Sequence, residues 1–262
     1  MRYLLAVVSS LLLLSSMRAE DKFDFAKTPG KLPKDVVPSQ YAIRIVPNLD
    51  KLTFTGSETI QLEVKTPVKN LMLHALEMEI AAATVDGKAL PKKAIVLNAG
   101  EQTLTLALPN ELPAGAHELA LKFAGKINPQ GQGLFYARYR EEGSDQKKIL
   151  LGTQFEATDA RRMFPCWDEP SFRARFQLTA VVPNDFMAVS NMPIEEEKKT
   201  EAGTEVRFGE TPAMSSYLVV FCAGDCAMID GEQAGGKLRI IAPKRRAEPW
   251  CLRPAGTRNN LP

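Results

Sequence analysis

Short runs of alternating apolar and polar residues recur along most of this chain, and they limit its fold more than any other feature. In one run, Ile60, Leu62 and Val64 fall on one face of an extended chain, while Gln61 and Glu63 fall on the other. Comparable runs occupy residues 41–46, 103–108, 117–123 and 176–182, with further candidates at 205–208, 217–221 and 237–241. No long stretch after the N-terminal segment shows the periodicity of an amphipathic helix. The sequence therefore predicts an all-β fold, with a saddle-like or sandwich arrangement of antiparallel strands.

Turn-forming residues separate these runs and support the same interpretation. Asp86-Gly87, Pro113-Ala114-Gly115 and Pro183-Asn184-Asp185 each fall between two candidate strands. The charged stretch at residues 193–200 shows no alternation, and we expect a loop or a single turn there.

The N-terminal residues have the features of an export signal. Arg2 precedes an apolar run at residues 4–14, and the small residue Ala19 lies before the charged stretch that follows. We expect residues 1–19 to be a signal peptide, residues 20–31 a linker, and residues 32–242 a single β domain. Residues 243–262 are rich in proline and arginine without periodicity, which is typical of a disordered tail or of a frameshift. The mature chain is then expected to be secreted or periplasmic, with no membrane contact after cleavage.

The charge balance and the few metal-binding side chains exclude several functions. The 33 basic and 31 acidic residues leave a formal charge of +2, which argues against a dedicated nucleic-acid binder. The two histidines, His74 and His117, are too few and too far apart for a histidine-based zinc site. Four cysteines are too few for a disulfide scaffold. Cys222 and Cys226 are close enough in sequence that either a small disulfide or two free thiols would fit.

The most distinctive segment spans residues 152–170. It concentrates charged side chains among aromatic ones: Glu156, Asp159, Arg161, Arg162, Asp168 and Glu169 among Phe155, Phe164 and Trp167. Such a segment is either a structural ion-pair network around aromatic anchors or a functional site, because both uses bring charges together.

This segment resembles the signature of the zinc-dependent aminopeptidase N family, and it reads T-Q-F-E-A-T-D-A-R-R-M-F-P-C-W-D-E-P in this chain. The resemblance extends over residues 32–242. Further matches lie at residues 32–33, 37–41, 54–56, 73–75, 123–125, 133–136, 188–193 and 208–218. It implies the all-β N-terminal domain of that family.

The resemblance also implies roles for two residues. Glu156 matches the family position that helps to anchor the free α-ammonium of a peptide, by a charge-assisted hydrogen bond. Gln154 matches a position that lines the S1 pocket, and it would face the same side as Glu156 if the segment stays extended. The expected partner is therefore a peptide N-terminus, bound weakly or not at all by this chain alone.

The catalytic motifs of the family do not occur in this sequence. Family members bind zinc through H-E-x-x-H and contact the substrate backbone through G-A-M-E-N, both in a following domain, and neither motif is present here. We therefore expect no catalytic residue, metal ligand or cofactor in this chain, and zinc only in a missing domain. The chain is then the substrate-recognition domain of a secreted zinc metallo-aminopeptidase, truncated or frameshifted near residue 242 and inactive alone.

Two alternatives remain open from the sequence. Glu156 could instead form a salt bridge with Arg161 or Arg162. In either case we expect the other charged residues of the segment to be structural and to hold its proline-bounded loop, between Pro165 and Pro170, against the sheet; these are Asp159, Arg161, Arg162, Asp168 and Glu169. The whole domain could likewise be a non-catalytic binding or packing module that retains only the fold.

Overall fold

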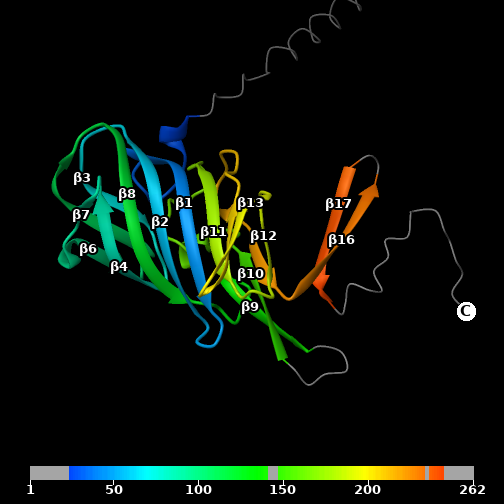
Figure 1. Cartoon of the computed structure of the whole chain (residues 1–262). Helices are drawn as coiled ribbons and strands as arrows, with labels where there is room; N and C mark the ends of the chain where they lie inside the picture. Colours follow the sequence, from blue (N-terminus) through cyan, green and yellow to red (C-terminus); the bar gives the residue numbers. More distant parts are fainter. Residues whose placement is uncertain (1–23, 141–146, 234–235, 245–262) are drawn as a thin grey trace, which may run out of the picture.

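The computed structural model describes residues 24–140, 147–233 and 236–244. The expected signal peptide and residues 245–262 of the expected tail lie outside these ranges. Within them the chain is built from strands and short 3-10 helices, which confirms the all-β class (Figure 1). The 3-10 helices are η2 (Phe25–Lys27), η3 (Lys92–Ala94), η4 (Ala160–Arg162) and η5 (Ser216–Leu218). None of the helices in the described part of the chain is long and apolar enough to span a membrane.

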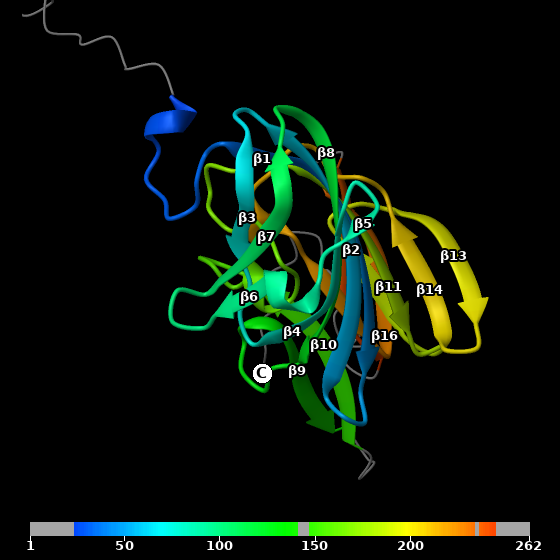
Figure 2. The ribbon, with the colours of Figure 1, turned by 90° about the vertical axis from the view of Figure 1, so that its left-hand side faces the viewer.

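Eight strands form a large sheet in the spatial order β13-β14-β11-β1-β2-β8-β4-β5 (Figure 2). From one edge to the other they are β13 (Ile194–Thr200), β14 (Gly203–Phe208), β11 (Arg175–Val182), β1 (Val36–Asn48), β2 (Thr53–Val64), β8 (Gly115–Lys126), β4 (Met78–Val85) and β5 (Lys88–Ala89).

The alternation read from the sequence selects the buried face of this sheet. Tyr41 of β1 pairs with Ile60 of β2, which pairs in turn with Leu119 of β8, and all three side chains are buried. Each such side chain contributes about 1.5–3 kcal/mol when it is fully removed from water. Because side chains alternate along a strand, burial of this row fixes the register of all three strands.

Two smaller sheets pack with the large sheet (Figure 1). The three-stranded sheet contains β3 (Val68–His74), β7 (Thr103–Leu112) and β6 (Ile95–Asn98). The four-stranded sheet contains β12 (Met187–Ser190), β15 (Phe221–Gly224), β10 (Lys147–Gln154) and β9 (Gly133–Arg140). Their buried side chains, such as Leu71, Leu104 and Phe221, join the core of the large sheet in one cluster.

A separate two-stranded sheet follows, formed by β16 (Cys226–Gln233) and β17 (Gly236–Pro243). Figure 1 shows it standing apart from the other sheets. Met228 and Ile241 are opposite each other in this pair, and both are exposed.

Three features differ from the sequence-based expectations. Residues 194–200, expected as a loop, form β13 at the edge of the large sheet, where nearly every side chain is exposed and no alternation is needed. Most of the candidate strand at 217–221 is instead η5 and its exit, and β15 begins only at Phe221. The large sheet is also not wholly antiparallel, because β1 and β11 run parallel.

Candidate functional site

The two predicted site residues lie at the end of β10. Gln154 is the last residue of the strand, and Glu156 is in the turn that follows it; both side chains are exposed. Between them Phe155 is buried, with its ring 6.0 Å from that of Phe164 in an edge-to-face arrangement. The strand therefore ends at Gln154, and the condition that the segment stays extended through Glu156 is not met. Phe155 anchors the segment in the core and leaves the two polar side chains at the surface.

The turn that carries Glu156 is closed by the main chain. The Asp159 N–H donates to the Phe155 carbonyl at 2.9 Å, and the Arg162 N–H donates to the Asp159 carbonyl at 3.1 Å, which starts η4. The Glu156–Ala157 peptide bond within this turn is cis.

The carboxylate of Glu156 takes no part in the ion pairs that its segment forms. Within the described ranges, Arg161 pairs with Asp168, while Arg162 pairs with Asp159 and Glu77. The alternative of a salt bridge from Glu156 to either arginine therefore does not occur in the structure. Glu156 is an exposed carboxylate in the turn after β10, outside these ion pairs, which leaves it available to a cation.

Arg161 and Asp168 form a buried cluster behind the turn. The Arg161 Nε donates to Asp168 Oδ2 at 2.9 Å, and its Nη2 donates to the Asp168 carbonyl at 2.9 Å. A third nitrogen, Nη1, donates to Gln102 Oε1 at 2.9 Å, and Ser216 Oγ donates to the second Asp168 oxygen at 2.5 Å. This cluster attaches the segment to the turn before β7, through Gln102, and to η5, through Ser216, in agreement with a structural role for these charges.

The central segment is also attached to β3. The N–H and carbonyl of His74 pair with the carbonyl and N–H of Cys166, at 2.8 and 3.0 Å. The side chains of both residues are buried, and burial raises the pKa of the Cys166 thiol well above its usual value, with the nearby Asp168 and Glu58 adding to the effect. Cys166 is therefore an inert core residue. Cys222 and Cys226 are both free thiols.

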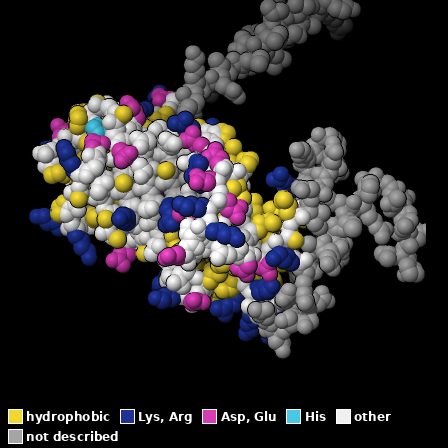
Figure 3. Space-filling model, viewed as in Figure 1, with side chains coloured by type: hydrophobic (Ala, Val, Ile, Leu, Met, Phe, Trp, Pro, Cys, Tyr) yellow, Lys and Arg dark blue, Asp and Glu magenta, His cyan; other side chains and the backbone are white. Residues whose placement is uncertain are grey.

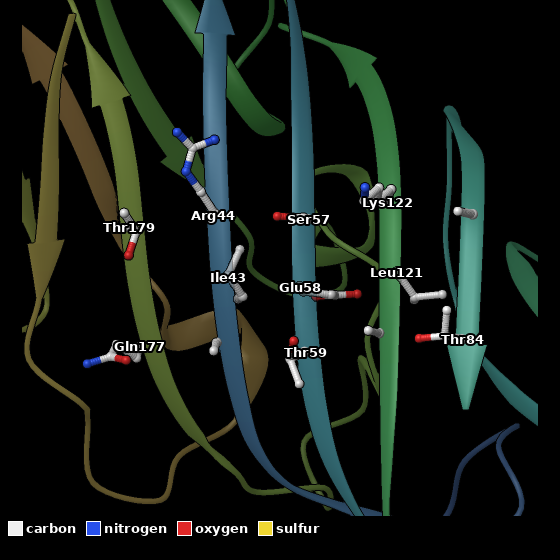
Figure 4. A pocket seen from close by; sticks show the side chains of 13 residues that line it. Ile43, Arg44, Ser57, Glu58, Thr59, Thr84, Leu121, Lys122, Gln177 and Thr179 are labelled. Atoms are coloured by element: carbon white, nitrogen blue, oxygen red, sulfur yellow. The ribbon is translucent and has the colours of Figure 1, made fainter. Parts of the chain in front are cut away.

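Glu58 is a buried carboxyl that no sequence pattern singles out. It pairs with Ile43 on β1 and Leu121 on β8, and it shares their face of the large sheet (Figure 4). Neither of its oxygens has a hydrogen-bond partner within the described ranges. Burial raises the pKa of this carboxyl well above its ordinary value. Glu58 therefore packs as a neutral acid in an apolar surrounding.

A shallow hollow of about 340 Å³ lies on the outer face of the large sheet (Figure 4). Its floor consists of the small side chains of Ala42, Ser57 and Ala120, and the longer side chains of Arg44 and Lys122 stand around it. Arg44 is already paired with Glu205 at 2.7 Å. Neither predicted site residue lines this hollow, and the face around it mixes acidic and basic side chains (Figure 3).

The described residues contain no group of three or more His, Cys, Asp or Glu side chains placed to hold a metal ion. His74 is buried beside Cys166, and His117 contacts Asp86 Oδ2 at 2.8 Å and the Pro113 carbonyl at 3.0 Å. These side chains do not fit a zinc site, and no catalytic step through zinc follows from this chain.

The sequence also matches known proteins. The model of the peptidase M1 N-terminal domain matches residues 37–218. An aminopeptidase N of Acetobacter pasteurianus is 39% identical over 249 residues, which are 93% of this chain and 69% of that protein. Aminopeptidase M1 of Arabidopsis thaliana is 36% identical over 232 residues, which are 86% of this chain and 26% of that protein. Aminopeptidase M1-A of rice is 39% identical over 212 residues, 79% of this chain and 24% of that protein.

The family match includes the segment with Gln154 and Glu156 and most of the large sheet. The all-β structure agrees with this match. The chain spans about a quarter of the length of the plant relatives. On the family match and these relatives together, this chain belongs to the family of peptidase M1 N-terminal domains.

Proposed function

We propose that this chain is the substrate-recognition domain of a zinc-dependent aminopeptidase, and that Glu156 and Gln154 hold the free amino end of a peptide. The observation that carries the proposal is the state of Glu156, an exposed carboxylate outside the ion pairs of its own segment. A carboxylate at a fixed place pairs with a terminal ammonium through a charge-assisted hydrogen bond. An internal peptide bond offers no such cation, so this anchor selects chain ends.

The names of the relatives support the reaction class. The proteins from Acetobacter, Arabidopsis and rice are all called aminopeptidases. In the proposed enzyme, zinc and the water that attacks the peptide carbonyl belong to a part outside this sequence. This chain then binds and orients the amino end but does not hydrolyse the peptide bond.

A direct test uses the purified chain and two small ligands. L-leucinamide carries a free ammonium, whereas N-acetyl-L-leucinamide has the same side chain without that charge. Titration followed by NMR should shift the backbone amides of residues 154–158 with the first ligand and not with the second. Glu156→Gln should abolish the shifts without changing the melting temperature, since the side chain is exposed. Equal shifts with both ligands, or with both proteins, would reject the ammonium site.

A second test concerns catalysis. The chain with added zinc should not release the chromophore from an amino-acid anilide, because its described residues provide no metal cluster and its sequence has no H-E-x-x-H. Turnover that a chelator abolishes would contradict this part of the proposal.

The alternative function, a packing module without ligand, predicts that Glu156→Gln is silent in every assay of the first test. The exposed position of both Gln154 and Glu156 favours the recognition role, because both side chains are accessible to a ligand.

We also propose that residues 1–19 direct export and are removed. The support is the sequence pattern of a basic start, an apolar run and a small residue. Intact mass measurement of the protein recovered from its native source tests this, and a chain that still begins at Met1 would contradict it.

A further inference from the structure

The side chain of Arg162 connects three segments around the turn that carries Glu156. Its Nε donates to Asp159 Oδ1 at 2.7 Å, and its Nη1 contacts Glu77 Oε2 at 2.5 Å. Asp159 closes the turn through its N–H, while Glu77 belongs to the link between β3 and β4. One guanidinium therefore ties the turn to a second part of the fold.

The base of the same side chain touches the strand pair that carries Gln154. Gly133 begins β9 and pairs with Gln154 at the end of β10. A Cβ at Gly133 would lie only 2.7 Å from the Arg162 Cβ, and the φ of Gly133 is +64°. Only glycine fits such a close approach in this conformation. Arg162 thus lies against Gly133, the residue of β9 that pairs with Gln154, and binds Asp159 of the turn that carries Glu156.

The Glu77 anchor is itself attached to η4. The N–H of Leu76 donates to the Arg161 carbonyl at 2.9 Å, which places the next residue beside Arg162. Glu77 has a φ of +56°, a backbone conformation that is uncommon for a residue with a side chain. The main chain therefore presents the Glu77 carboxylate to the arginine, although that side chain is itself 55% exposed.

The burial and charge of Arg162 separate this contact from an ordinary surface pair. Its side chain is 17% exposed and its Asp159 partner 20% exposed. Partial burial by itself would lower the pKa of the guanidinium, but the hydrogen bonds to Glu77 and Asp159 outweigh burial and raise it. A planar group that binds two carboxylates restricts both, which a single exposed ion pair does not.

We propose that Arg162 is a positioning residue for the ammonium site: with Glu77 and Asp159 it fixes the turn of Glu156 relative to Gln154. The proposal rests on the function proposed for Glu156. Arg162 itself touches no ligand and acts through the turn.

The experiment compares Arg162→Gln with a matched control in the full chain. Arg207 also binds two carboxylates, those of Glu195 and Glu196 at 2.6 and 3.3 Å, but it lies on β14 near the far edge of the large sheet. Arg207→Gln therefore removes a contact between one arginine and two carboxylates away from the site, at a side chain that is 39% exposed. The probe is L-leucinamide, titrated as in the test of Glu156.

We expect Arg162→Gln to weaken leucinamide binding by about tenfold, a change of 1.4 kcal/mol, and Arg207→Gln to leave it unchanged. Hydrogen exchange of the Asp159 amide, which is bonded to the Phe155 carbonyl, should become faster only in the Arg162 variant. Arg162→Lys should recover little of the leucinamide affinity, because an ammonium does not bridge two carboxylates with the geometry of a guanidinium. If Arg162→Gln does not fold, Glu77→Gln replaces it, since that change removes only the exposed anchor.

The outcomes separate the two proposals. Leucinamide binding that is lost in Glu156→Gln but kept in Arg162→Gln would overturn the positioning role and leave the ammonium site in place. Equal losses in the Arg162 and Arg207 variants would also overturn it, because the effect would then be general. Absence of binding by the wild-type chain would reject the proposal that this chain holds an amino end by itself, and the role of Arg162 in that binding with it.

Discussion

Leu32 and Glu169 lie 137 residues apart in the sequence and are joined by a hydrogen bond of 2.9 Å from the Leu32 N–H to Glu169 Oε1. The N–H of Lys31 donates to the same oxygen at 2.6 Å. Gly30 comes so close that a Cβ there would lie 2.0 Å from the other carboxylate oxygen. Glu169 therefore holds the chain where it enters the domain through two main-chain N–H groups, and Lys34 Nζ lies 3.6 Å from its other oxygen.

Glu169→Ala should release this N-terminal segment. The change removes two charge-assisted hydrogen bonds from a carboxylate that is 8% exposed, and we expect a loss of about 2–4 kcal/mol in the free energy of unfolding. Trypsin should also cleave after Lys27 or Lys31 faster than in the wild type. Glu63→Ala, at an exposed position of β2, is the control and should alter neither property. Unchanged cleavage in the Glu169 variant would contradict this attachment.

Glu58 should make the domain less stable as the pH rises. Because its pKa is raised in the folded state, the folded chain keeps a proton that the unfolded chain releases above about pH 4.3. Stability is therefore lost as the pH increases from that value toward the pKa of the folded state. Glu58→Gln cannot ionise, so its stability relative to the wild type should rise as the pH is raised from 4.5 to 8. Urea unfolding at both pH values measures this, and a constant difference would contradict it.

His74 should make the domain less stable as the pH falls. Burial, together with the charges of Arg161 and Lys31, lowers the pKa of His74 to about 3. In the unfolded chain His74 takes up a proton below about pH 6.5, whereas in the folded chain it stays neutral down to about pH 3. The free energy of unfolding therefore decreases as the pH falls from 6.5 to 3. His74→Gln should therefore lose about 2 kcal/mol less than the wild type when the pH is changed from 7 to 4.5. Parallel unfolding curves for the two proteins over this range would show that His74 is not the cause.

Asp168→Ala should be the most damaging of these changes. It leaves the buried guanidinium of Arg161 without its carboxylate and removes the acceptor of Ser216. Loss of one partner from a buried pair costs about 3–5 kcal/mol, which is a large share of the stability of a typical domain. Ser216→Ala, which removes one hydrogen bond and keeps the ion pair, should cost only about 1–2 kcal/mol. Thermal unfolding of both variants tests this order, and equal losses would contradict it.

The core strands could be predicted from the sequence because one face of each strand is buried and the other is more exposed. Strand β2 alternates between the core and the outer face, and its burial follows the predicted pattern at Ile60, Leu62 and Val64. Strand β13 could not be predicted, because its sheet neighbour covers one edge and neither face is buried. Residues 194–200 form a strand only because they pair with β14. Since both faces are exposed, their sequence needs no alternation that would predict this pairing.

The sequence proposes two candidate site residues, whose role stays a prediction, but it does not reveal the contacts around them. The signature segment drew attention to Gln154 and Glu156, and the structure leaves both exposed at the end of β10. Glu77 could not be found in the same way, since it lies outside every motif and meets Arg162 only through the fold. Glu58 escaped for another reason: it is in phase with Ile60 and therefore on the core face, beside Ile43 and Leu121, but it lies just before the run in which the alternation is recognised.

The parallel pairing of β1 with β11 has a consequence for synthesis of the chain. Strand β1 lies between β2, which follows it directly, and β11, which begins only at Arg175. During translation the edge of β1 that will pair with β11 therefore stays without its partner strand until more than a hundred further residues have left the ribosome. This interval is the time at which a chaperone would be most useful to the nascent protein and at which self-association would begin.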